Sequence, residues 1–174
     1  MITIRPSRDD DIVRITEIYS YYVLNTTYTF EIEAPSIEEM ANRRRDVLNK
    51  DLPYLVAEQD GLVVGYASCN WFKPRAAYRF ATELSIFFRK DTCGQGFGRQ
   101  LLSALIEKAE LEGIRKMIAV IGDCLNERSV ALHRSLGFSH VGTFKSCGWK
   151  FNRWLDVFLM EKNIGEGDTT SPDN

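Results

Sequence analysis

The sequence has little that would bind a metal, cross a membrane or attract nucleic acid. It contains only 2 histidines and 4 cysteines, and the cysteines are widely spaced with no C-x-x-C pair. Neither a zinc site nor a disulfide framework is therefore expected. No apolar run approaches the roughly 20 residues of a membrane helix. Lys and Arg total 22 against 24 Asp and Glu, a net charge of -2, so no basic excess points to nucleic acid or an anionic membrane.

The composition is typical of one soluble globular domain. Hydrophobic residues make up 44% of the 174 residues and charged residues 26%, which excludes a disordered or fibrous class. We expect a domain over residues 1–164 and a disordered tail over 165–174, because the last ten residues are small and polar. The first residues carry no basic region followed by an apolar stretch, so we expect a cytoplasmic protein.

Hydrophobic periodicity predicts the order of strands and helices. Strands are expected over residues 2–5, 54–59, 62–72, 81–89, 117–121, 140–149 and 154–161. Helices are expected over residues 9–22, 36–49, 99–113 and 126–136. Ser36 and Glu39 have the spacing of a capping box. The continuous apolar run 117–121 predicts a strand that is buried on both faces.

This order predicts the fold class. Hairpins in the first and last quarters, one of them turning at Asp60-Gly61, predict antiparallel pairs. Strand–helix–strand alternation in the second half predicts a parallel pair. The expected fold is α/β: a single domain with a mixed, twisted sheet, antiparallel in its N-terminal part and parallel in its central pair, with helices on both faces.

A glycine-rich turn joins the strand 81–89 to the next helix. Gly94, Gly96 and Gly98 alternate there, and a helix N-terminus behind flexible glycines suits a phosphate or pyrophosphate. The G-x-G-x-G spacing matches the dinucleotide fingerprint poorly, and no lysine follows Gly98 as it would in a P-loop. A turn that only connects two elements is the alternative.

Several segments carry a resemblance to a known family. Residues 93–98, Cys-Gly-Gln-Gly-Phe-Gly, resemble the acetyl-CoA pyrophosphate loop of the GNAT N-acetyltransferase superfamily, although Cys93 stands where that loop carries Gln or Arg. Residues 126–138, an asparagine and a helix ending in Gly-Phe, resemble the superfamily's second motif. Further segments are similar to the phosphinothricin and methionine sulfoximine acetyltransferase family, namely 19–27, 64–68, 132–138 and 150–156. The resemblance covers residues 2–162 and implies a GNAT-like domain that uses acetyl-CoA and no metal.

The resemblance also implies where the cofactor binds. The pantetheine arm would lie along Ile86, Phe87 and Phe88 like an added strand, bonded to their main-chain groups. A backbone N–H in this stretch would meet the negative charge that develops on the acetyl oxygen. Asn126 would bind the cofactor arm, with plain helix capping as the alternative. The pyrophosphate would lie against Gly94, Gln95, Gly96, Phe97, Gly98 and Arg99.

Glu83 and His133 are the candidate catalytic residues. Glu83 stands at the position of the family's catalytic glutamate and would take a proton from the acceptor amine, directly or through water. An exposed strand glutamate in a charge pair is the alternative. His133 stands where the resembled family carries a histidine and would give a proton to the departing thiolate. The alternative is a histidine that a backbone carbonyl satisfies within a short helix.

A basic and aromatic cluster ahead of Glu83 is the candidate acceptor site. Lysine and arginine suit the carboxylate of an amino acid and the phosphinate of phosphinothricin, and the resemblance implies substrate contacts for Ala76, Ala77 and Tyr78. A solvated loop is the alternative for any one of the charges. Phe30 is expected to wall the pocket. The candidate substrate-binding residues are Phe30, Lys73, Arg75, Ala76, Ala77 and Tyr78.

Together these features predict an acetyl-CoA-dependent N-acetyltransferase. It would act by direct transfer on the α-amine of a small amino acid or analogue such as phosphinothricin, methionine sulfoximine or methionine sulfone. One rival is acetylation of a polyamine, an antibiotic or a protein N-terminus, and another is a non-catalytic acetyl-CoA-binding sensor. By analogy with the family we expect a homodimer that binds neither nucleic acid nor membrane.

Overall fold

The elements follow the predicted order. The computed structural model of the chain describes residues 1–123 and 125–172. Its strands are β1 (Thr3–Pro6), β2 (Tyr54–Gln59), β3 (Leu62–Trp71), β4 (Ala81–Phe88), β5 (Lys116–Gly122), β6 (Ser139–Lys150) and β7 (Arg153–Asn163). Its helices are α1 (Ile12–Asn25), α2 (Ile37–Leu48), α3 (Phe97–Leu111) and α4 (Glu127–Ser135). Short 3-10 turns lie at Asp9–Asp11, Ala76–Tyr78 and Lys90–Thr92.

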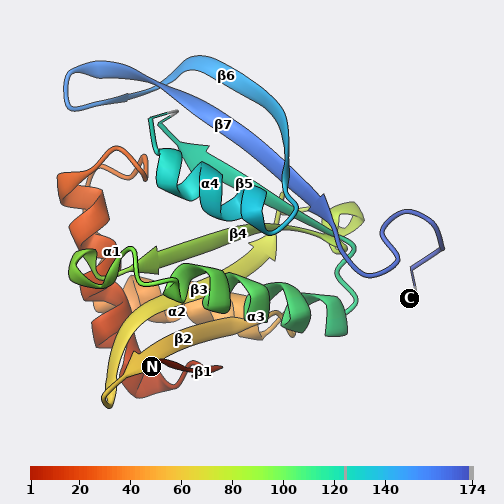
Figure 1. Cartoon of the computed structure of the whole chain (residues 1–174), viewed down its shortest axis with the longest axis horizontal. Helices are drawn as coiled ribbons and strands as arrows, with labels where there is room; N and C mark the ends of the chain where they lie inside the picture. The colour runs from red at the N-terminus through yellow and green to blue at the C-terminus, as the bar shows by residue number, and fades with distance from the viewer. Residues whose placement is uncertain (124, 173–174) are drawn as a thin grey trace.

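The strands form one mixed sheet in the order β1-β2-β3-β4-β5-β7-β6. Every neighbouring pair is antiparallel except β4 and β5, which are parallel. Helices α1 and α2 lie on one face, and α3 and α4 lie on the other (Figure 1). The predicted α/β class, with its parallel central pair and helices on both faces, is confirmed.

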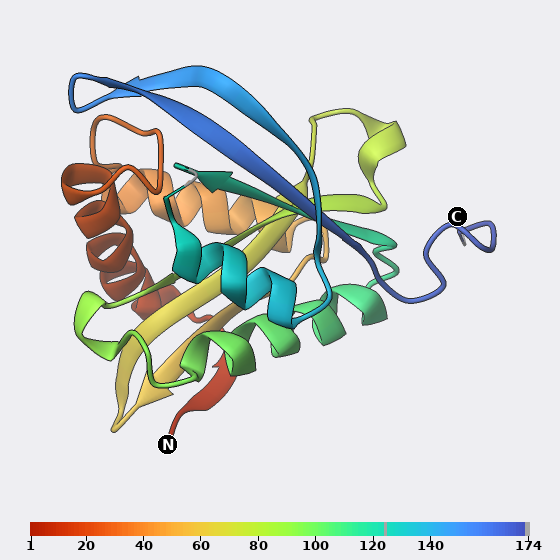
Figure 2. The ribbon, with the colours of Figure 1, turned by 45° about the horizontal axis from the view of Figure 1, so that its top comes forward.

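The paired stretch between β4 and β5, which we call the seam, is short, and it leaves an opening in the middle of the sheet. Register pairs run only from Ala81 with Lys116 to Glu83 with Ile118, although both strands continue beyond this point. The strands therefore diverge, as Figure 2 shows, and the later residues of β4 have no strand partner on the β5 side. The prediction that strand 117–121 is buried on both faces is wrong at Val120, which is 36% exposed, because it lies at the opening between the two diverging strands.

Local sequence signals account for the element ends. The Ser36 hydroxyl accepts a hydrogen bond from the Glu39 N–H (3.1 Å) and caps α2. Asp60 and Gly61 both have positive φ, as a tight hairpin turn requires. Helix α1 follows a 3-10 turn and extends three residues past the predicted end at residue 22, to Asn25.

The core lies between the helices and the first half of the sheet. On α3, Leu101, Leu102 and Leu105 are fully buried, and each contributes about 1.5–3 kcal/mol to stability. On α1, Ile15 and Val23 are buried in the same way against the opposite face. This packing fixes the strands whose free edges line the site.

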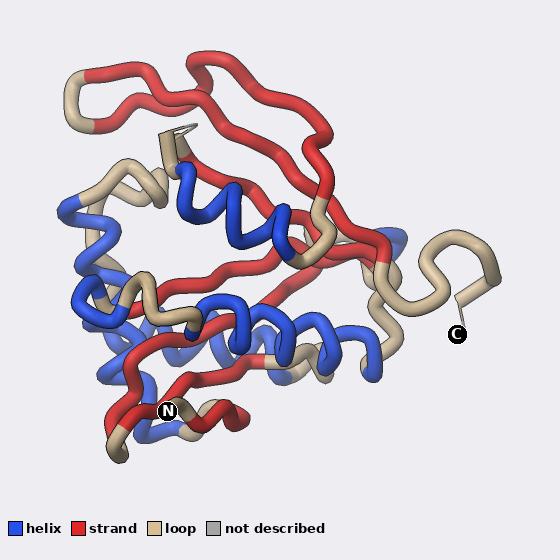
Figure 3. Tube along the Cα trace, viewed as in Figure 1, coloured by secondary structure: helices blue, strands red, loops and turns tan. Residues whose placement is uncertain are grey.

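The loops that flank β4 lie at opposite ends of the molecule (Figure 3). Segment 72–80 precedes β4, and segment 89–96 follows it. Beyond β7, residues 165–172 run beside Arg115, whose guanidinium donates to the Thr170 hydroxyl (3.0 Å). Residues 173–174 of the expected tail lie outside the described residues. Across residues 1–123 and 125–172, no helix combines the length and the apolarity needed to cross a membrane.

Candidate active site

A cleft of about 870 Å³ occupies the divergence of β4 and β5. Glu83–Phe88 of β4 line one side, and Ala119–Gly122 of β5 line the other. The glycine loop, residues 93–98, and α4 border it on one face of the sheet, whereas Tyr22 and residues 28–30 border it on the other. Since α4 and α1 lie on opposite faces, the cleft passes through the sheet and can be reached from both sides.

The glycine loop leaves open backbone donors at the start of α3. Gly94 and Gly96 have φ of +85° and +78°, and an added Cβ would meet nothing within 4 Å at either position. Gly96 is the N-cap of α3 and provides no side-chain cap. Gly98 instead allows α3 and α4 to pack closely, because a Cβ there would lie 3.3 Å from the Leu132 side chain of α4. Open N–H groups at the positive end of a 15-residue helix fit a pyrophosphate.

The free edge of β4 is held firmly from the α1 face. The Tyr22 hydroxyl donates to the Phe88 carbonyl (2.6 Å), and burial raises the pKa of Tyr22, which keeps this hydroxyl protonated. The Phe87 ring packs against Tyr19 and Tyr22 with ring centroids 5.1 Å apart. The backbone groups of residues 84–87 are therefore presented to the cleft by a strand that cannot shift easily.

Glu83 stands where the seam ends. It pairs with Asn70 of β3 and with Ile118 of β5, and its carboxylate reaches the cleft. Burial raises the pKa of Glu83, and the charge of Lys73 partly opposes this rise. Within residues 1–123 and 125–172, no group donates a hydrogen bond to the carboxylate. A half-buried carboxylate with a raised pKa and free lone pairs is suited to accept a proton.

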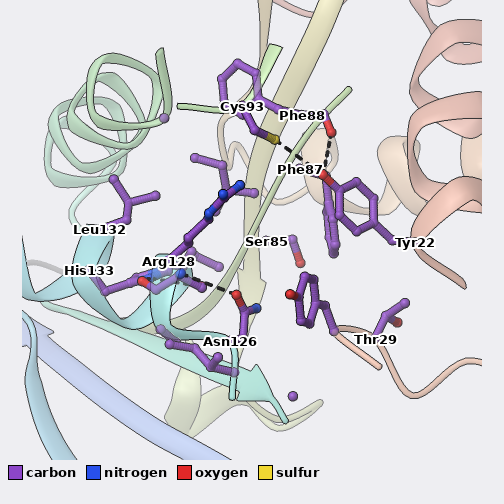
Figure 4. Close-up of a pocket in the computed structure, with 18 of the residues that line it drawn as sticks. Tyr22, Thr29, Ser85, Phe87, Phe88, Cys93, Asn126, Arg128, Leu132 and His133 are labelled. Carbon is purple, nitrogen blue, oxygen red and sulfur yellow. Dashed lines mark hydrogen bonds between the residues drawn. The ribbon is translucent and has the colours of Figure 1, made fainter. Parts of the chain in front are cut away.

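His133 and Asn126 reach the cleft from α4 (Figure 4). The Nδ1–H of His133 donates to the Ser129 carbonyl (2.7 Å), because a carbonyl can only accept. The buried Nε2 has no hydrogen-bond partner in the described part of the chain, and burial lowers the pKa of the ring. The Asn126 side chain accepts from the Ser129 N–H (3.4 Å), so it caps α4 as well as lining the cleft.

Most predicted site residues meet at this cleft, and one group does not. The residues that line it are Phe30, Glu83, Ile86, Phe87, Phe88, Gly94, Gly96, Phe97, Gly98, Arg99, Asn126 and His133. The residues outside its lining are Gln95, Lys73, Arg75, Ala76, Ala77 and Tyr78. The last five belong to segment 72–80, where Tyr78 packs edge-on against Phe72 (5.8 Å) and the Lys73 ammonium lies over the same ring (4.8 Å).

A segment of which the sequence reasoning found only Phe30 borders the α1 face of the cleft. We call residues 26–31 the strap. On one side it is tied to the second half of the sheet: the Thr27 hydroxyl donates to the Asp123 carboxylate (2.6 Å), and the buried Lys150 ammonium donates to the Thr29 carbonyl (2.9 Å). Arg153 donates to the same Asp123 oxygen (2.6 Å).

On its other side the strap is tied to the helices of the first half. The Tyr19 hydroxyl lies 2.9 Å from the Thr29 hydroxyl and donates to Glu31 (2.8 Å). Arg43 of α2 donates to the same carboxylate (2.6 Å). The strap therefore bridges the two halves of the sheet at the mouth of the cleft, as Figure 2 shows beneath the tip of the β6–β7 hairpin.

For some of the other residues that line the cleft, the sequence held a signal, and for others it held none. Arg128 lines the cleft from the first turn of α4, and its place behind Asn126 was a usable signal. Tyr28, Thr29 and Gly122 had none, since their role depends on contacts between distant segments. In the described residues no group of three or more His, Cys, Asp and Glu could hold a metal. Cys69, Cys93 and Cys147 are free thiols, and Cys124 lies outside the described residues.

Comparisons with known proteins agree with this geometry. Residues 4–159 match the acetyltransferase (GNAT) domain family. The chain is 46% identical to the phosphinothricin N-acetyltransferase of Alcaligenes faecalis, over 98% of this chain and 87% of that protein. It is 39% identical to an L-methionine sulfoximine/L-methionine sulfone acetyltransferase of Pseudomonas aeruginosa, over 93% and 94%. The structure of a phosphinothricin acetyltransferase from Sinorhizobium meliloti in complex with acetyl-CoA matches with a TM-score of 0.96 and 42% identity, over 99% of this chain and 94% of that one.

Proposed function

Because the chain belongs to the GNAT family of acetyl-CoA-dependent acetyltransferases, we propose that it acetylates the α-amine of a small amino acid or close analogue. The acceptor would be of the phosphinothricin, methionine sulfoximine or methionine sulfone type, as in the named relatives. The observation that carries the proposal is the cleft through the sheet. It places one carboxylate, Glu83, between a face suited to the cofactor and a face enclosed by the strap.

The residues on the α3 face fit acetyl-CoA. When bound, the cofactor supplies a thioester whose acetyl group is open to attack by an amine. In this proposal the backbone of residues 84–88 binds the pantetheine arm, and the open N–H groups of the glycine loop bind the pyrophosphate. Arg99 and Arg128, both in the lining, add positive charge for the phosphates, and Asn126 contacts the arm.

Glu83 is proposed as the general base. An α-amine at a peptide terminus has a pKa of about 8, and that of a free amino acid is higher, so most acceptor molecules arrive protonated. Burial raises the pKa of Glu83, which brings it nearer to that of the amine and makes proton transfer less unfavourable. The carboxylate takes the proton directly or through one water.

His133 is proposed to protonate the departing sulfur from Nε2. Its Nδ1 proton is committed to Ser129, so Nε2 carries a proton only in the imidazolium form. Because burial lowers the pKa of the ring below its ordinary value, the neutral ring predominates at neutral pH. Nε2 would first take up a proton from solvent or from the acceptor ammonium and would then pass it to the thiolate. The unpartnered Nε2 supports this role.

The acceptor would enter from the α1 face. Phe30, Tyr28 and Thr29 of the strap line that side of the cleft. Lys73 is the cation whose charge reaches Glu83, and it would attract the carboxylate of an amino acid at this end. The same proposal includes contacts of the bound acceptor with Arg75 and residues 76–78. These contacts would form when the acceptor extends from the cleft towards segment 72–80.

We further propose a cytoplasmic homodimer. Acetyl-CoA is an intracellular metabolite, and the β6–β7 hairpin carries exposed aromatic side chains, with Phe144 60%, Trp149 55% and Trp154 62% exposed. Exposed apolar groups gathered on one element are typical of an interaction surface. Light scattering during gel filtration would give the mass of two chains, and Trp149→Ser with Trp154→Ser would reduce it to one. A monomeric wild type would contradict this part.

The primary test is CoA release measured with a thiol reagent, after subtraction of the protein's own cysteines. The panel contains phosphinothricin, methionine sulfoximine, methionine sulfone, the common amino acids, spermidine and an aminoglycoside. Turnover confined to amino acids and their analogues is expected. Turnover only with spermidine or the aminoglycoside would replace the acceptor class, and silence with acetyl-CoA still raising the melting temperature would favour a sensor.

A further inference from the structure

We propose that Gly148 sets the size of the acceptor's side chain by providing the seat of the Phe30 ring, an inference that rests on the proposed function. Gly148 is buried in β6, and a Cβ added there would lie under 3.0 Å from three atoms of the Phe30 ring. Its φ is not positive, so the backbone does not require glycine. The space that the Phe30 ring occupies is therefore the reason for a glycine at position 148.

A second glycine borders the same ring. Gly122, at the end of β5, would place a Cβ 3.1 Å from Phe30, and it too has no positive φ. Two strands of the second half thus offer bare backbone to one aromatic side chain from the first half. The ring also lines the cleft, so its position decides where the cleft ends.

The residues on both sides of Phe30 are tied to other elements, which resists a shift of the strap. The preceding residue, Thr29, is fixed by Lys150 and Tyr19, and the following residue, Glu31, by Tyr19 and Arg43. A methyl group at position 148 would therefore displace the ring. Since glycine backbone lies behind the ring and the cleft is open in front of it, the ring would turn into the cleft and shorten the space for the acceptor.

Three sulfones of graded length test this inference: S-methylcysteine sulfone, methionine sulfone and ethionine sulfone. Gly148→Ala should raise the ratio of kcat/KM for each acceptor over the next longer one by roughly tenfold, the discrimination expected of one methylene. Phe30→Leu should shift the ratio in the opposite direction. The KM for acetyl-CoA should stay within about twofold of wild type, because the ring lies on the acceptor side.

Two glycines serve as matched controls. Gly142 lies in the same strand without positive φ, and an added Cβ meets nothing within 4 Å, so Gly142→Ala should leave the ratio unchanged. Gly65 also lacks positive φ, but a Cβ there would lie under 3.0 Å from the Phe88 ring. Gly65→Ala should therefore impair acetyl-CoA binding without changing the acceptor ratio. Equal ratios in Gly148→Ala and Gly142→Ala would overturn the inference.

A thermal cycle separates failure of the seat from failure of the proposed function. Gly148→Ala should lower the melting temperature when Phe30 is present and have little effect when it is combined with Phe30→Ala, because the small side chain no longer meets the methyl group. This cycle needs no substrate. If the wild type acetylates no sulfone but the cycle shows coupling, the acceptor proposal fails and the seat stands. Equal losses in both backgrounds would overturn the seat itself.

Discussion

From β1 to β4 each strand pairs with its neighbour along most of its length, and helices cover both faces. From β5 to β7 the sheet carries exposed aromatic side chains, and in the described part of the chain its strands pair with the first half only over Ala81–Glu83. The closely packed half lines the cleft along β4 and the glycine loop. The second half, with Gly122, Asp123, Gly148 and Lys150, holds the strap. Under the proposed function, the difference teaches that a strand edge fixed by helices would bind the constant cofactor, with help from Asn126 and Arg128. The strap, which the second half holds in place, would fit the variable acceptor.

The largest effect is expected at the point where the halves meet. Glu83→Gln keeps the shape of the side chain but removes the base, so kcat/KM for the acceptor should fall by about 10²- to 10⁴-fold. Glu161 lies opposite Ile118, the same residue that pairs with Glu83, and its carboxylate binds Lys116 instead of lining the cleft. Glu161→Gln should therefore retain activity. Undiminished turnover in Glu83→Gln would remove the base from the mechanism.

The next effect tests whether the first half binds the cofactor through backbone geometry. Gly96→Ala forces a side chain into φ of +78°, which costs roughly 1–2 kcal/mol and should distort the open donors. The KM for acetyl-CoA should rise about tenfold, with the acceptor KM little changed. Gly113→Ala at the far end of α3 has a φ of +79° and equal space. It should cost similar stability in a denaturant titration and leave the KM alone; a matched rise would show a general folding defect.

A smaller effect distinguishes the two halves by their buried carboxylates. Asp123 (4% exposed) binds Arg153 and Thr27 of the strap, and Asp11 (7% exposed) binds Arg5 far from the cleft. Replacing either Asp by Asn should destabilise the fold by about 1–3 kcal/mol. Only Asp123→Asn should raise the acceptor KM severalfold, because only it loosens the strap. Steady-state kinetics with both variants check this. Equal KM values for the acceptor in the two variants would show that the strap does not position the acceptor.

The smallest effect is a shift in pH dependence. Glu83 must be ionised to act as a base, so activity falls as the pH drops through its pKa. Lys73 holds that pKa below the value that burial alone would give, and Lys73→Ala should therefore raise it and move the acid limb of kcat/KM to higher pH. Arg75→Ala is the control, because Lys73 is the cation that influences Glu83. If the acid limb of kcat/KM does not move in Lys73→Ala, or moves equally in both variants, Lys73 is not the cation that lowers the pKa of Glu83.

The sequence predicted the first half better than the second. The strand patterns of 54–59 and 81–89, the turn at Asp60-Gly61 and the glycine loop are local signals, and local geometry follows from them. The candidates Glu83, Asn126 and His133 came from the family resemblance, and the structure brings all three to the cleft. Even the wrong expectation for strand 117–121 came from a correct strand, since its apolar pattern holds no information on where β4 leaves it.

What could not be predicted depends on distant contacts. Thr27 binds Asp123, Lys150 reaches Thr29, and Gly148 receives the Phe30 ring, although about a hundred residues separate the partners in the chain. No periodicity or spacing encodes such pairs, and a glycine in a strand reads as a bulge or a weakness when its neighbour is unknown. Of the strap, only Phe30 was therefore predicted, and the acceptor site was expected mainly in segment 72–80.

The parting of β4 and β5 also has an evolutionary consequence. In the proposed function, residues 84–88 would offer the acetyl donor backbone groups, which no ordinary side-chain substitution removes, whereas the acceptor would meet side chains of the strap, which Lys150 of the last hairpin holds. A duplicated gene can therefore drift towards a new amine through residues 26–31 and 148–153 without surrendering its acetyl donor. Selection on the two ligands is uncoupled by the same divergence that opens the sheet.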